Sequence, residues 1–365
     1  MKHKQIDFLF VLHRPEFFDF VKPIFDTLES AGCRCLTLKS NEINDFKIRL
    51  QKRDLSEPSV VLSTNEFQEI SLFENSKKVL LPHSIFIRDS TPTPDSLGFR
   101  FFSEFDFYFA PNVFWFEWII KSLIDVSYYD HLNQKKKPKF IIPGGYLKKL
   151  PSTSSEFQQI NNESPLILYA PSVFSPELKE HRFHIDGSKI LISLAKSFPQ
   201  ARLICRPHPT DSHEKYIQHA LSSLAEYRNV SFDFSLTPNA KLYSEPDIVI
   251  TDMSGFAFTH EFVTTLKPIF MFNKFSTETK RFAQLASTFG DIATSVEELI
   301  MLVARKLASA DYLEKSEVEV FRNLFLGKVN SPNQLLIDLM SIKNSSPSVT
   351  WLEVPFLFDT LRHHH

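Results

Sequence analysis

The chain has 365 residues, which exceeds the usual size of a single hydrophobic core and indicates two domains. Hydrophobic residues make up 43% and charged residues 23%, as in globular domains rather than disordered chains. The 41 basic and 43 acidic side chains nearly cancel, which argues against nucleic-acid binding through bulk positive charge.

The cysteines and the apolar runs indicate the compartment. Cys33, Cys35 and Cys205 are too few for a disulfide framework, and C-x-C alone is not a zinc pattern. The N-terminus lacks a signal-peptide pattern, and no run reaches the roughly 20 apolar residues of a membrane span. We therefore expect a cytoplasmic protein in a reducing compartment, and we take His363–His365 as the remnant of a purification tag.

Apolar runs alternate with helical patterns along the first half. Helices are expected at Phe17–Leu28 and at the aromatic segment Val113–Ile120. Strands are expected at Ile6–Leu12, Cys33–Leu38, Val60–Ser63, Lys78–Leu81, Asp106–Ala110 and Phe140–Pro143. Continuous apolar runs of this length, separated by helices, indicate a parallel sheet that is covered on both faces.

The polar segment Leu150–Ser164 is the expected linker, and the alternation restarts after it. Helices are expected at Lys189–Phe198, around Tyr216–Leu224, at Phe256–Leu266 and over most of Val296–Ile342. Strands are expected at Leu166–Ala170, Ala201–Cys205, Val230–Phe234, Asp247–Thr251 and Pro268–Phe272.

The two α/β patterns predict two Rossmann-like, doubly wound domains that face each other across a cleft. We expect an N-terminal domain over 1–155 and a C-terminal domain over 156–345. The remaining segment, 346–362, is expected to pack back on the first domain.

A phosphate site must be built here without a glycine-rich loop, because the chain has only 8 glycines and neither the dinucleotide nor the P-loop pattern. The sharpest candidate is Arg206-Pro207-His208-Pro209, directly after an expected strand. Its prolines hold the backbone extended at a strand end, which is where open α/β sheets bind ligands. Arg206 offers a planar fork of donors and His208 a further donor. The alternative is a structural turn in which His208 caps a backbone carbonyl.

A second candidate lies where the strand Asp247–Thr251 runs through Ser254 and Gly255 into an expected helix. Backbone N–H groups at a helix start attract anions, Thr251 and Ser254 offer hydroxyl donors, and Gly255 permits close approach. The alternative is ordinary helix capping by Ser254 or Asp252. With Arg206 and His208 one motif earlier, phosphate binding is the better interpretation.

His83 also ends an apolar strand, in Leu80-Leu81-Pro82-His83, and could be either structural or catalytic. No D-x-D pair and no histidine–cysteine cluster predicts a metal, and no pattern predicts a bound cofactor. The basic run Gln134–Lys139 and the aromatic segment Val113–Ile120 are most simply a solvated loop and a core helix. The alternative is peripheral contact with the inner membrane surface.

Together, these motifs resemble the CDP-glycerol glycerophosphotransferases, which are teichoic-acid polymerase-type enzymes of the GT-B fold. The matching segments are Leu168–Ser172, Arg206–Pro209, Asp247–Gly255, Phe262 and Lys267–Ile269. A weaker match places Pro82-His83 at the family's catalytic His-Gly and Gly144-Gly145-Tyr146 at its Gly-Tyr-Pro.

The resemblance implies specific roles for these residues. The catalytic histidines would be His83, as the base that activates the acceptor hydroxyl, and His208. The nucleotide pocket would comprise Tyr169, Ala170, Pro171 and Ser172. The donor pyrophosphate would be held by Arg206, His208, Thr251, Ser254 and Gly255. The enzyme would need no metal.

The acceptor side departs more from the family than the phosphate side. The family's His-Gly-Thr-Pro-Leu-Lys is here His83–Arg88, Ala-Pro-Thr-Trp-Arg is Ala170–Phe174, and Tyr-Ser-Ser is Met253–Gly255. We expect a transferase that moves glycerophosphate or a sugar from a CDP- or CMP-linked donor to a cell-surface polysaccharide or lipid-linked acceptor, with no nucleic-acid partner. The alternatives are another nucleotide-sugar glycosyltransferase, a nucleotide-sugar epimerase, and a non-catalytic polysaccharide-binding module.

Overall fold

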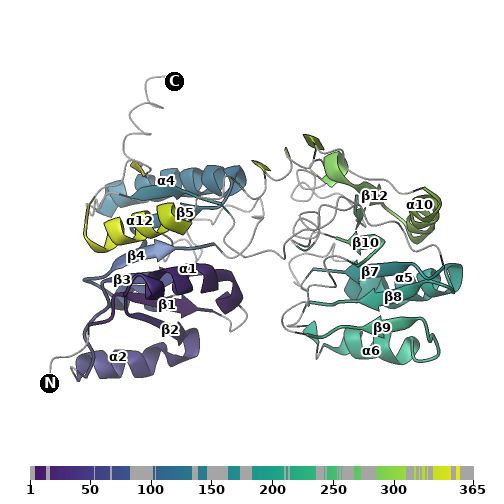
Figure 1. Cartoon of the computed structure of the whole chain (residues 1–365), viewed down its shortest axis with the longest axis horizontal. Coiled ribbons are helices and arrows are strands. Elements are labelled where there is room, and N and C mark those ends of the chain that lie inside the picture. The colour runs from purple at the N-terminus through teal and green to yellow at the C-terminus, as the bar shows by residue number, and fades with distance from the viewer. Residues whose placement is uncertain are drawn as a thin grey trace. The chain divides into compact units, whose positions relative to one another are not determined.

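The computed structural model divides into two compact units, which are described separately (Figure 1). Unit 1 comprises Met1–Lys149 and Asn323–His365, and unit 2 comprises Leu150–Arg322. The structure describes residues 5–13, 17–52, 54–65, 68–82, 102, 104–133, 139–145, 163–172, 183–208, 211–212, 214–235, 242, 245–252, 254, 256, 267–272, 284, 286–309, 316–317, 320, 323–324, 327, 332–346 and 351–353.

Unit 1 contains a seven-stranded sheet in the order β13-β6-β5-β4-β3-β1-β2. Strands β1 to β6 are parallel, and β13 pairs antiparallel with β6 at the edge. The strands are β1 (Phe8–Leu12), β2 (Cys35–Lys39), β3 (Val60–Ser63), β4 (Lys77–Leu80), β5 (Phe107–Ala110), β6 (Phe140–Pro143) and β13 (Leu352–Glu353). The parallel arrangement suits strands such as β1 and β5, which are apolar and buried at every position and must be covered on both faces.

Helices cover both faces of this sheet. Leu9 and Val11 of β1 belong to a core cluster with residues of α2 (Ile43–Gln51) and α4 (Val113–Asn133). Phe10 points the other way, and its ring lies 5.5 Å from that of Phe25 in α1 (Phe18–Ser30). Alternate residues of one strand therefore serve two cores, and each fully buried side chain contributes about 1.5–3 kcal/mol.

The last part of the chain completes unit 1. Helix α12 (Pro332–Lys343) packs against α1, and Lys343 Nζ lies 2.6 Å from Asp7 Oδ1. Trp351 packs edge-on against Phe107 of β5, just before β13. The expected second domain, 156–345, is therefore corrected at its end, because α12 belongs to unit 1. The periodicity of α12 showed that it has an apolar face but not which sheet that face covers.

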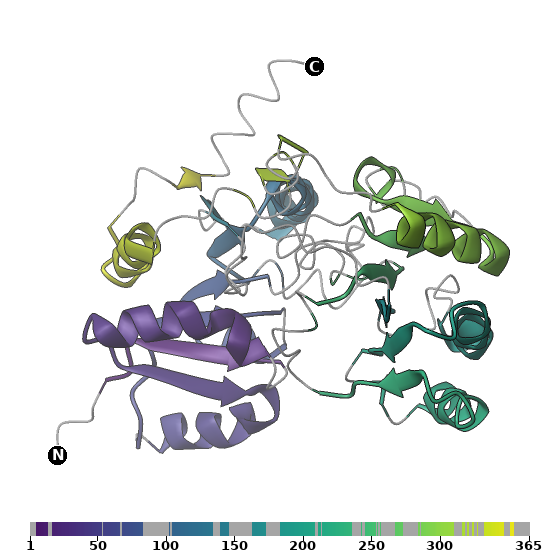
Figure 2. The same cartoon turned by 45° about the vertical axis from the view of Figure 1, so that its right-hand side comes forward.

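Unit 2 contains a six-stranded parallel sheet in the order β12-β11-β10-β7-β8-β9. The strands are β7 (Leu166–Ala170), β8 (Arg202–Cys205), β9 (Val230–Phe232), β10 (Ile248–Thr251), β11 (Ile269–Met271) and β12 (Asp291–Ala293). Figure 2 shows α5 (Phe183–Ser197), α6 (Lys215–Ser223) and α10 (Val296–Ala308), in teal and green, on one side of these strands.

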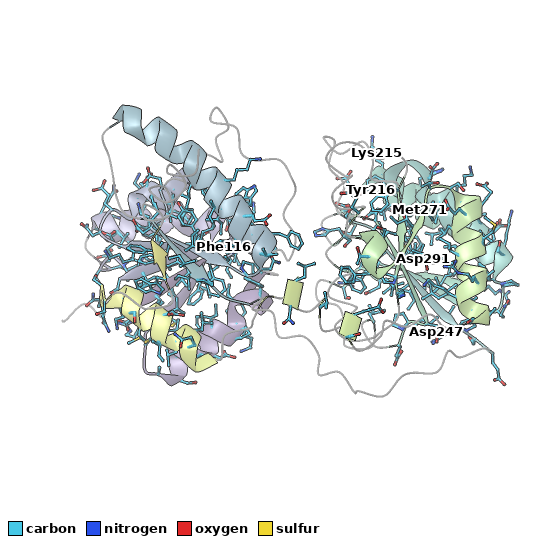
Figure 3. All side chains as sticks on the ribbon, turned by 90° about the horizontal axis from the view of Figure 1, so that it is seen from above. Phe116, Lys215, Tyr216, Asp247, Met271 and Asp291 are labelled. Atoms are coloured by element: carbon cyan, nitrogen blue, oxygen red, sulfur yellow. The ribbon has the colours of Figure 1, made fainter. Side chains whose placement is uncertain are left out.

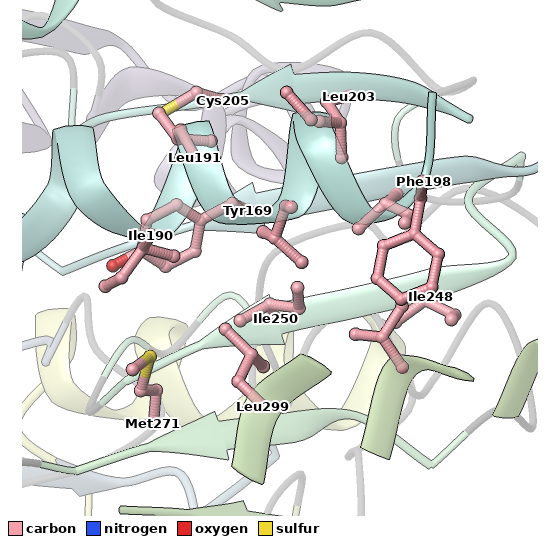
Figure 4. Packing of buried hydrophobic residues seen from close by; sticks show 14 of the residues in the cluster. Tyr169, Ile190, Leu191, Phe198, Leu203, Cys205, Ile248, Ile250, Met271 and Leu299 are labelled. Carbon is pink, nitrogen blue, oxygen red and sulfur yellow. The ribbon is translucent and has the colours of Figure 1, made fainter. Parts of the chain in front are cut away.

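Those three helices and the strands enclose the main core of unit 2 (Figure 4). Tyr169 of β7 lies in this core together with Ile190 of α5 and Ile250 of β10, and it is 1% exposed. Leu168 and Val249 face the other side of the sheet, in a smaller cluster that includes Leu242. The alternation again buries both faces of the sheet.

The expected doubly wound α/β architecture is present in both units, with strand boundaries within a few residues of those expected. Helix α2 and strand β12 were not predicted. The expected helix Phe256–Leu266 lies, beyond its first residue, outside the described part of the chain.

Candidate functional site

The strand order of unit 2 identifies where its loops can converge. From β7 the chain adds β8 and β9 on one side, then returns to add β10 and β11 on the other. The point between β7 and β10 is a topological switch point, where open α/β sheets bind ligands at the carboxyl ends of the strands. Residues after β7, β8 and β10 therefore share one edge of the sheet. They include Ser172, His208 and Ser254.

The turn after β8 is fixed by hydrogen bonds at both ends. Arg206 N donates to Tyr169 O at 2.8 Å, and Asp211 N donates to His208 O at 2.9 Å. Asp211 is itself buried. Burial of Tyr216 and the negative charge of Asp211 beside it raise the pKa of the Tyr216 hydroxyl well above the ordinary value. His208 is half-buried within this turn. The strand end thus holds a partly accessible imidazole on a constrained backbone.

Arg206 is engaged within the protein. Its side chain is 6% exposed, and its guanidinium forms an ion pair with Asp233, just beyond β9. Its Nη1 also donates to Ser235 Oγ at 2.9 Å, and its Nη2 donates to Ser235 O at 2.9 Å. The direct phosphate contact expected for Arg206 remains a prediction, and the contacts observed are those of a clamp between the ends of β8 and β9.

Asp233 is ionised over the ordinary range of pH. Burial pushes its pKa upward, but hydrogen bonds from Ser235 and the charge and hydrogen bond of Arg206 outweigh burial, so the net pKa lies below the ordinary 3.8. Because the folded-state pKa is lowered, the ionised carboxylate stabilises the fold fully above the ordinary pKa of 3.8, and this contribution is lost as the pH falls from there through the folded-state pKa.

The turns after β7 and β10 are tied to each other. Thr251 Oγ1 donates to Ala170 O at 2.7 Å, and Ser172 N donates to Asp252 Oδ1 at 2.8 Å. The single hydroxyl proton of Thr251 is therefore directed at β7. Ser254 Oγ accepts a hydrogen bond from Phe256 N at 3.2 Å, the kind of local contact that begins a turn or helix.

The residues expected to line the nucleotide pocket differ in access. Tyr169 and Ala170 are 1% and 2% exposed, and their carbonyl oxygens accept hydrogen bonds from Arg206 N and Thr251 Oγ1. Pro171 is also buried, whereas Ser172 is half-buried. Of this segment, Ser172 is the residue with a side chain at the surface of the strand edge.

Two predicted site residues, His83 and Gly255, lie outside the described residues. Leu81, two positions before His83, continues β4 at the carboxyl edge of the unit 1 sheet, where its N–H donates to Ser63 O at 2.7 Å. The role expected for His83 as a general base therefore remains a prediction.

Asp233 and Ser235 were missed at the sequence level. The available signal was Phe232-Asp233-Phe234-Ser235, in which two polar residues spaced by two follow an apolar strand. Such spacing places both on one side of an extended chain, next to the neighbouring strand end. Phe232 and Phe234 stack with ring centroids 5.8 Å apart.

The described residues contain no group of three histidine, cysteine or acidic side chains that could hold a metal ion. The three cysteines are free, and burial raises the pKa of the Cys205 thiol well above its ordinary value. Within the described part of the chain, no helix is both long and apolar enough to cross a membrane.

Comparison with known structures defines the fold class. The two parallel-sheet α/β units form a GT-B-like fold. Comparisons with protein-family models and with curated protein sequences give no significant match.

Three solved structures are similar along nearly the whole chain. One is Staphylococcus aureus MnaA solved with UDP, at 12% identity and a TM-score of 0.58, covering 94% of this chain and 99% of that one. The UDP-GlcNAc 2-epimerase from Neisseria meningitidis has 15% identity and a TM-score of 0.55, with 93% and 100% covered. The wall teichoic acid polymerase TagF has 16% identity and a TM-score of 0.53, with 94% and 90% covered.

Proposed function

We propose that this chain is a metal-independent transferase. It moves a glycerophosphate or sugar unit from a CDP- or CMP-linked donor to a hydroxyl of a cell-surface polysaccharide or teichoic-acid-like acceptor. The donor phosphates bind at the strand edge of unit 2, near His208, Ser254 and Gly255. The similarity of the fold to enzymes solved with UDP or UDP-GlcNAc supports a nucleotide-linked donor.

The observation that carries this proposal is the convergence of two constrained turns at the switch point of unit 2. The turn after β8 holds His208, and the turn after β10 holds Ser254 beside the N–H of Phe256. Fixed donors at such an edge suit a pyrophosphate, which is present before the acceptor arrives. Because hydrogen bonds constrain the turns that carry these side chains, the donors need little reorganisation as charge develops on the leaving phosphate.

The proposed reaction begins at His83, which takes the proton of the acceptor hydroxyl. In glycerophosphate transfer the acceptor oxygen bonds to the β-phosphorus, the bond to the α-phosphate oxygen breaks, and CMP leaves with the electron pair. In sugar transfer the acceptor oxygen bonds to the anomeric carbon, and the nucleotide leaves with the anomeric oxygen. In both cases His208 and Ser254 stabilise the charge that grows on the departing phosphate.

A donor screen tests this function. The protein is incubated with CDP-glycerol and with CMP-, CDP-, UDP- and GDP-linked sugars, each with lipid-linked and oligosaccharide acceptors. We expect nucleotide release that depends on the acceptor and is greatest with a cytidine donor. Acceptor-dependent release from none of the donors would contradict the proposal, and release from a uridine donor alone would revise the nucleobase.

The second candidate is a nucleotide-sugar epimerase. It is favoured by the similarity to epimerase structures, which is at least as strong as that to the polymerase: TM-scores are 0.55 for the Neisseria enzyme and 0.53 for TagF. An epimerase converts its sugar nucleotide without an acceptor. Incubation with UDP-GlcNAc alone, followed by proton NMR of the sugar ring, therefore separates the two functions. Appearance of the C2 epimer would favour the epimerase.

We predict that transfer activity survives chelation. The described residues supply no acidic or histidine cluster for a metal, and the proposed charge stabilisation comes from His208, Ser254 and backbone N–H groups. Turnover measured with EDTA in excess over any metal in the assay should match the untreated rate. Complete loss that magnesium or manganese restores would show that a metal takes part.

A further inference from the structure

We infer that Asp233 and Ser235 are positioning residues that hold Arg206 in place as a structural support, or strut, for the turn that carries His208. In this arrangement His208 contacts the donor phosphates, and Arg206 does not. This inference rests on the proposed function, and it assigns the residue that contacts the phosphates and the two that orient it. Neither Asp233 nor Ser235 lies in the motifs that suggested the site.

The donors of Arg206 are largely committed to the protein. A guanidinium carries five N–H donors, and three of them reach Asp233 Oδ2, Ser235 Oγ and Ser235 O. The two acceptor residues are themselves tied together, because Ser235 N donates to Asp233 Oδ1 at 3.0 Å. The guanidinium of Arg206 therefore binds a turn at the end of β9 that is closed by its own hydrogen bond.

The charge of Arg206 is also largely cancelled. Arg206 is 6% exposed and Asp233 is 22% exposed, so the pair lies mostly out of water, where its attraction is little screened. A phosphate that used this guanidinium would have to compete with a carboxylate already in contact. Breaking a buried pair costs far more than an exposed pair contributes, because it leaves an uncompensated charge.

Pro207, a rigid residue, links Arg206 to His208, so the position of Arg206 determines that of His208. Arg206 N donates a hydrogen bond to Tyr169 O. Pro207 is buried, and its ring fixes its φ angle. A residue before proline is restricted to extended conformations, so Arg206-Pro207 forms a stiff arm. On its far side, His208 O accepts from Asp211 N at 2.9 Å. Removing the contact between Arg206 and Asp233 therefore makes the Arg206-Pro207 segment, which positions the His208 imidazole, less rigid.

The direction in which Asp233→Asn changes nucleotide affinity shows whether Arg206 is a strut or a direct phosphate ligand. If Arg206 binds phosphate, Asp233→Asn removes a competing negative charge, and nucleotide should bind as tightly as before or more tightly. If Arg206 is a strut, Asp233→Asn should weaken the binding of CMP and CDP roughly tenfold to hundredfold, as for partners that orient a ligand-binding side chain. Arg206→Lys keeps the charge but loses the fork, and it should weaken binding similarly. The double variant should show no further loss.

Asp247→Asn is the matched control. Asp247 Oδ2 accepts from Leu166 N at 2.7 Å, so it also ties two strands through a carboxylate. It precedes β10, at the amino end of the sheet, and Figure 3 shows it and Tyr216 toward opposite sides of unit 2. Its replacement should lower thermal stability without changing nucleotide affinity. Ser235→Ala, which leaves the charges in place, serves if Asp233→Asn does not fold.

Calorimetry with CMP and CDP gives the affinities, and amide hydrogen exchange without nucleotide gives the rigidity of the turn. We expect weaker binding and faster exchange at Arg206 N and Asp211 N in Asp233→Asn but not in Asp247→Asn. Unchanged or tighter binding in Asp233→Asn would overturn the inference. If the wild-type protein binds no nucleotide, the proposed function fails, and unchanged exchange at these two amides then overturns the strut as well.

Discussion

His208→Ala should weaken the binding of CMP, CDP and UDP by roughly tenfold to hundredfold, whereas His83→Ala should leave it nearly unchanged and lower turnover by about a hundredfold or more. The two histidines are assigned to different events. His208 lies in the constrained turn at the carboxyl edge of unit 2, where the donor phosphate is present before the acceptor arrives. A general base touches the acceptor hydroxyl and so acts on turnover. Ser254→Ala should weaken nucleotide binding in the same way, by a smaller factor.

Calorimetry with the three nucleotides and turnover with the best donor from the screen measure both effects. His219→Ala is the matched control, because His219 is exposed on α6 in the same unit, and it should change neither quantity. If His83→Ala abolished nucleotide binding while His208→Ala left it intact, the donor and acceptor sides would be exchanged.

Gly327→Ala should destabilise unit 1 by on the order of 3 kcal/mol, which is roughly 10 °C in melting temperature for a domain of this size. Two effects add. Gly327 has a φ of +64°, a conformation that costs an L-residue about 1–2 kcal/mol. An added Cβ would also lie 2.2 Å from Pro111 O and 2.9 Å from Gly144 O, so backbone at the ends of β5 and β6 would have to move.

Gly32→Ala isolates the first effect. Gly32 ends helix α1 in the same unit with a φ of +81°, but an added Cβ there meets nothing within 4 Å. We therefore expect a loss of about 1 kcal/mol, from the backbone conformation alone. Thermal and urea unfolding of the two variants measure the difference. Equal losses would mean that the contact of Gly327 with Pro111 does not constrain the fold.

The strands could be predicted from the sequence because several central strands are apolar along their whole length. Phe8–Leu12 and Leu166–Ala170 are buried at each position, and such runs leave a parallel sheet as the natural arrangement. Strand β12 was missed because Asp291–Ala293 has only three residues and begins with an acidic one. Its Asp291 forms ion pairs with Arg305 and Lys306 of α10, a partnership that depends on tertiary structure.

The strand-end turns of the candidate site could also be located, but the use of their side chains could not. Arg206 lies only two positions before His208 in the sequence, yet its partners are Asp233 and Ser235, which the parallel pairing of β8 with β9 brings alongside. Thr251 likewise ends its strand as expected, while its hydroxyl donates to Ala170 O. The sequence indicates which hydrogen-bond donors lie at the edge of a sheet. The register between neighbouring strands determines which of these donors are already hydrogen-bonded within the protein.

Unit 1 is assembled from the two extremes of the chain, and this sets an order for events on the ribosome. When residue 322 has been made, unit 2 is complete, while unit 1 still lacks α12, the Asp7–Lys343 ion pair and the edge strand β13. The face of α1 that α12 covers therefore stays exposed to solvent while the whole of unit 2 is synthesised. The domain translated second can therefore finish folding first. A nascent chain stalled within the second half should expose this apolar face to chaperones until the C-terminal helix emerges.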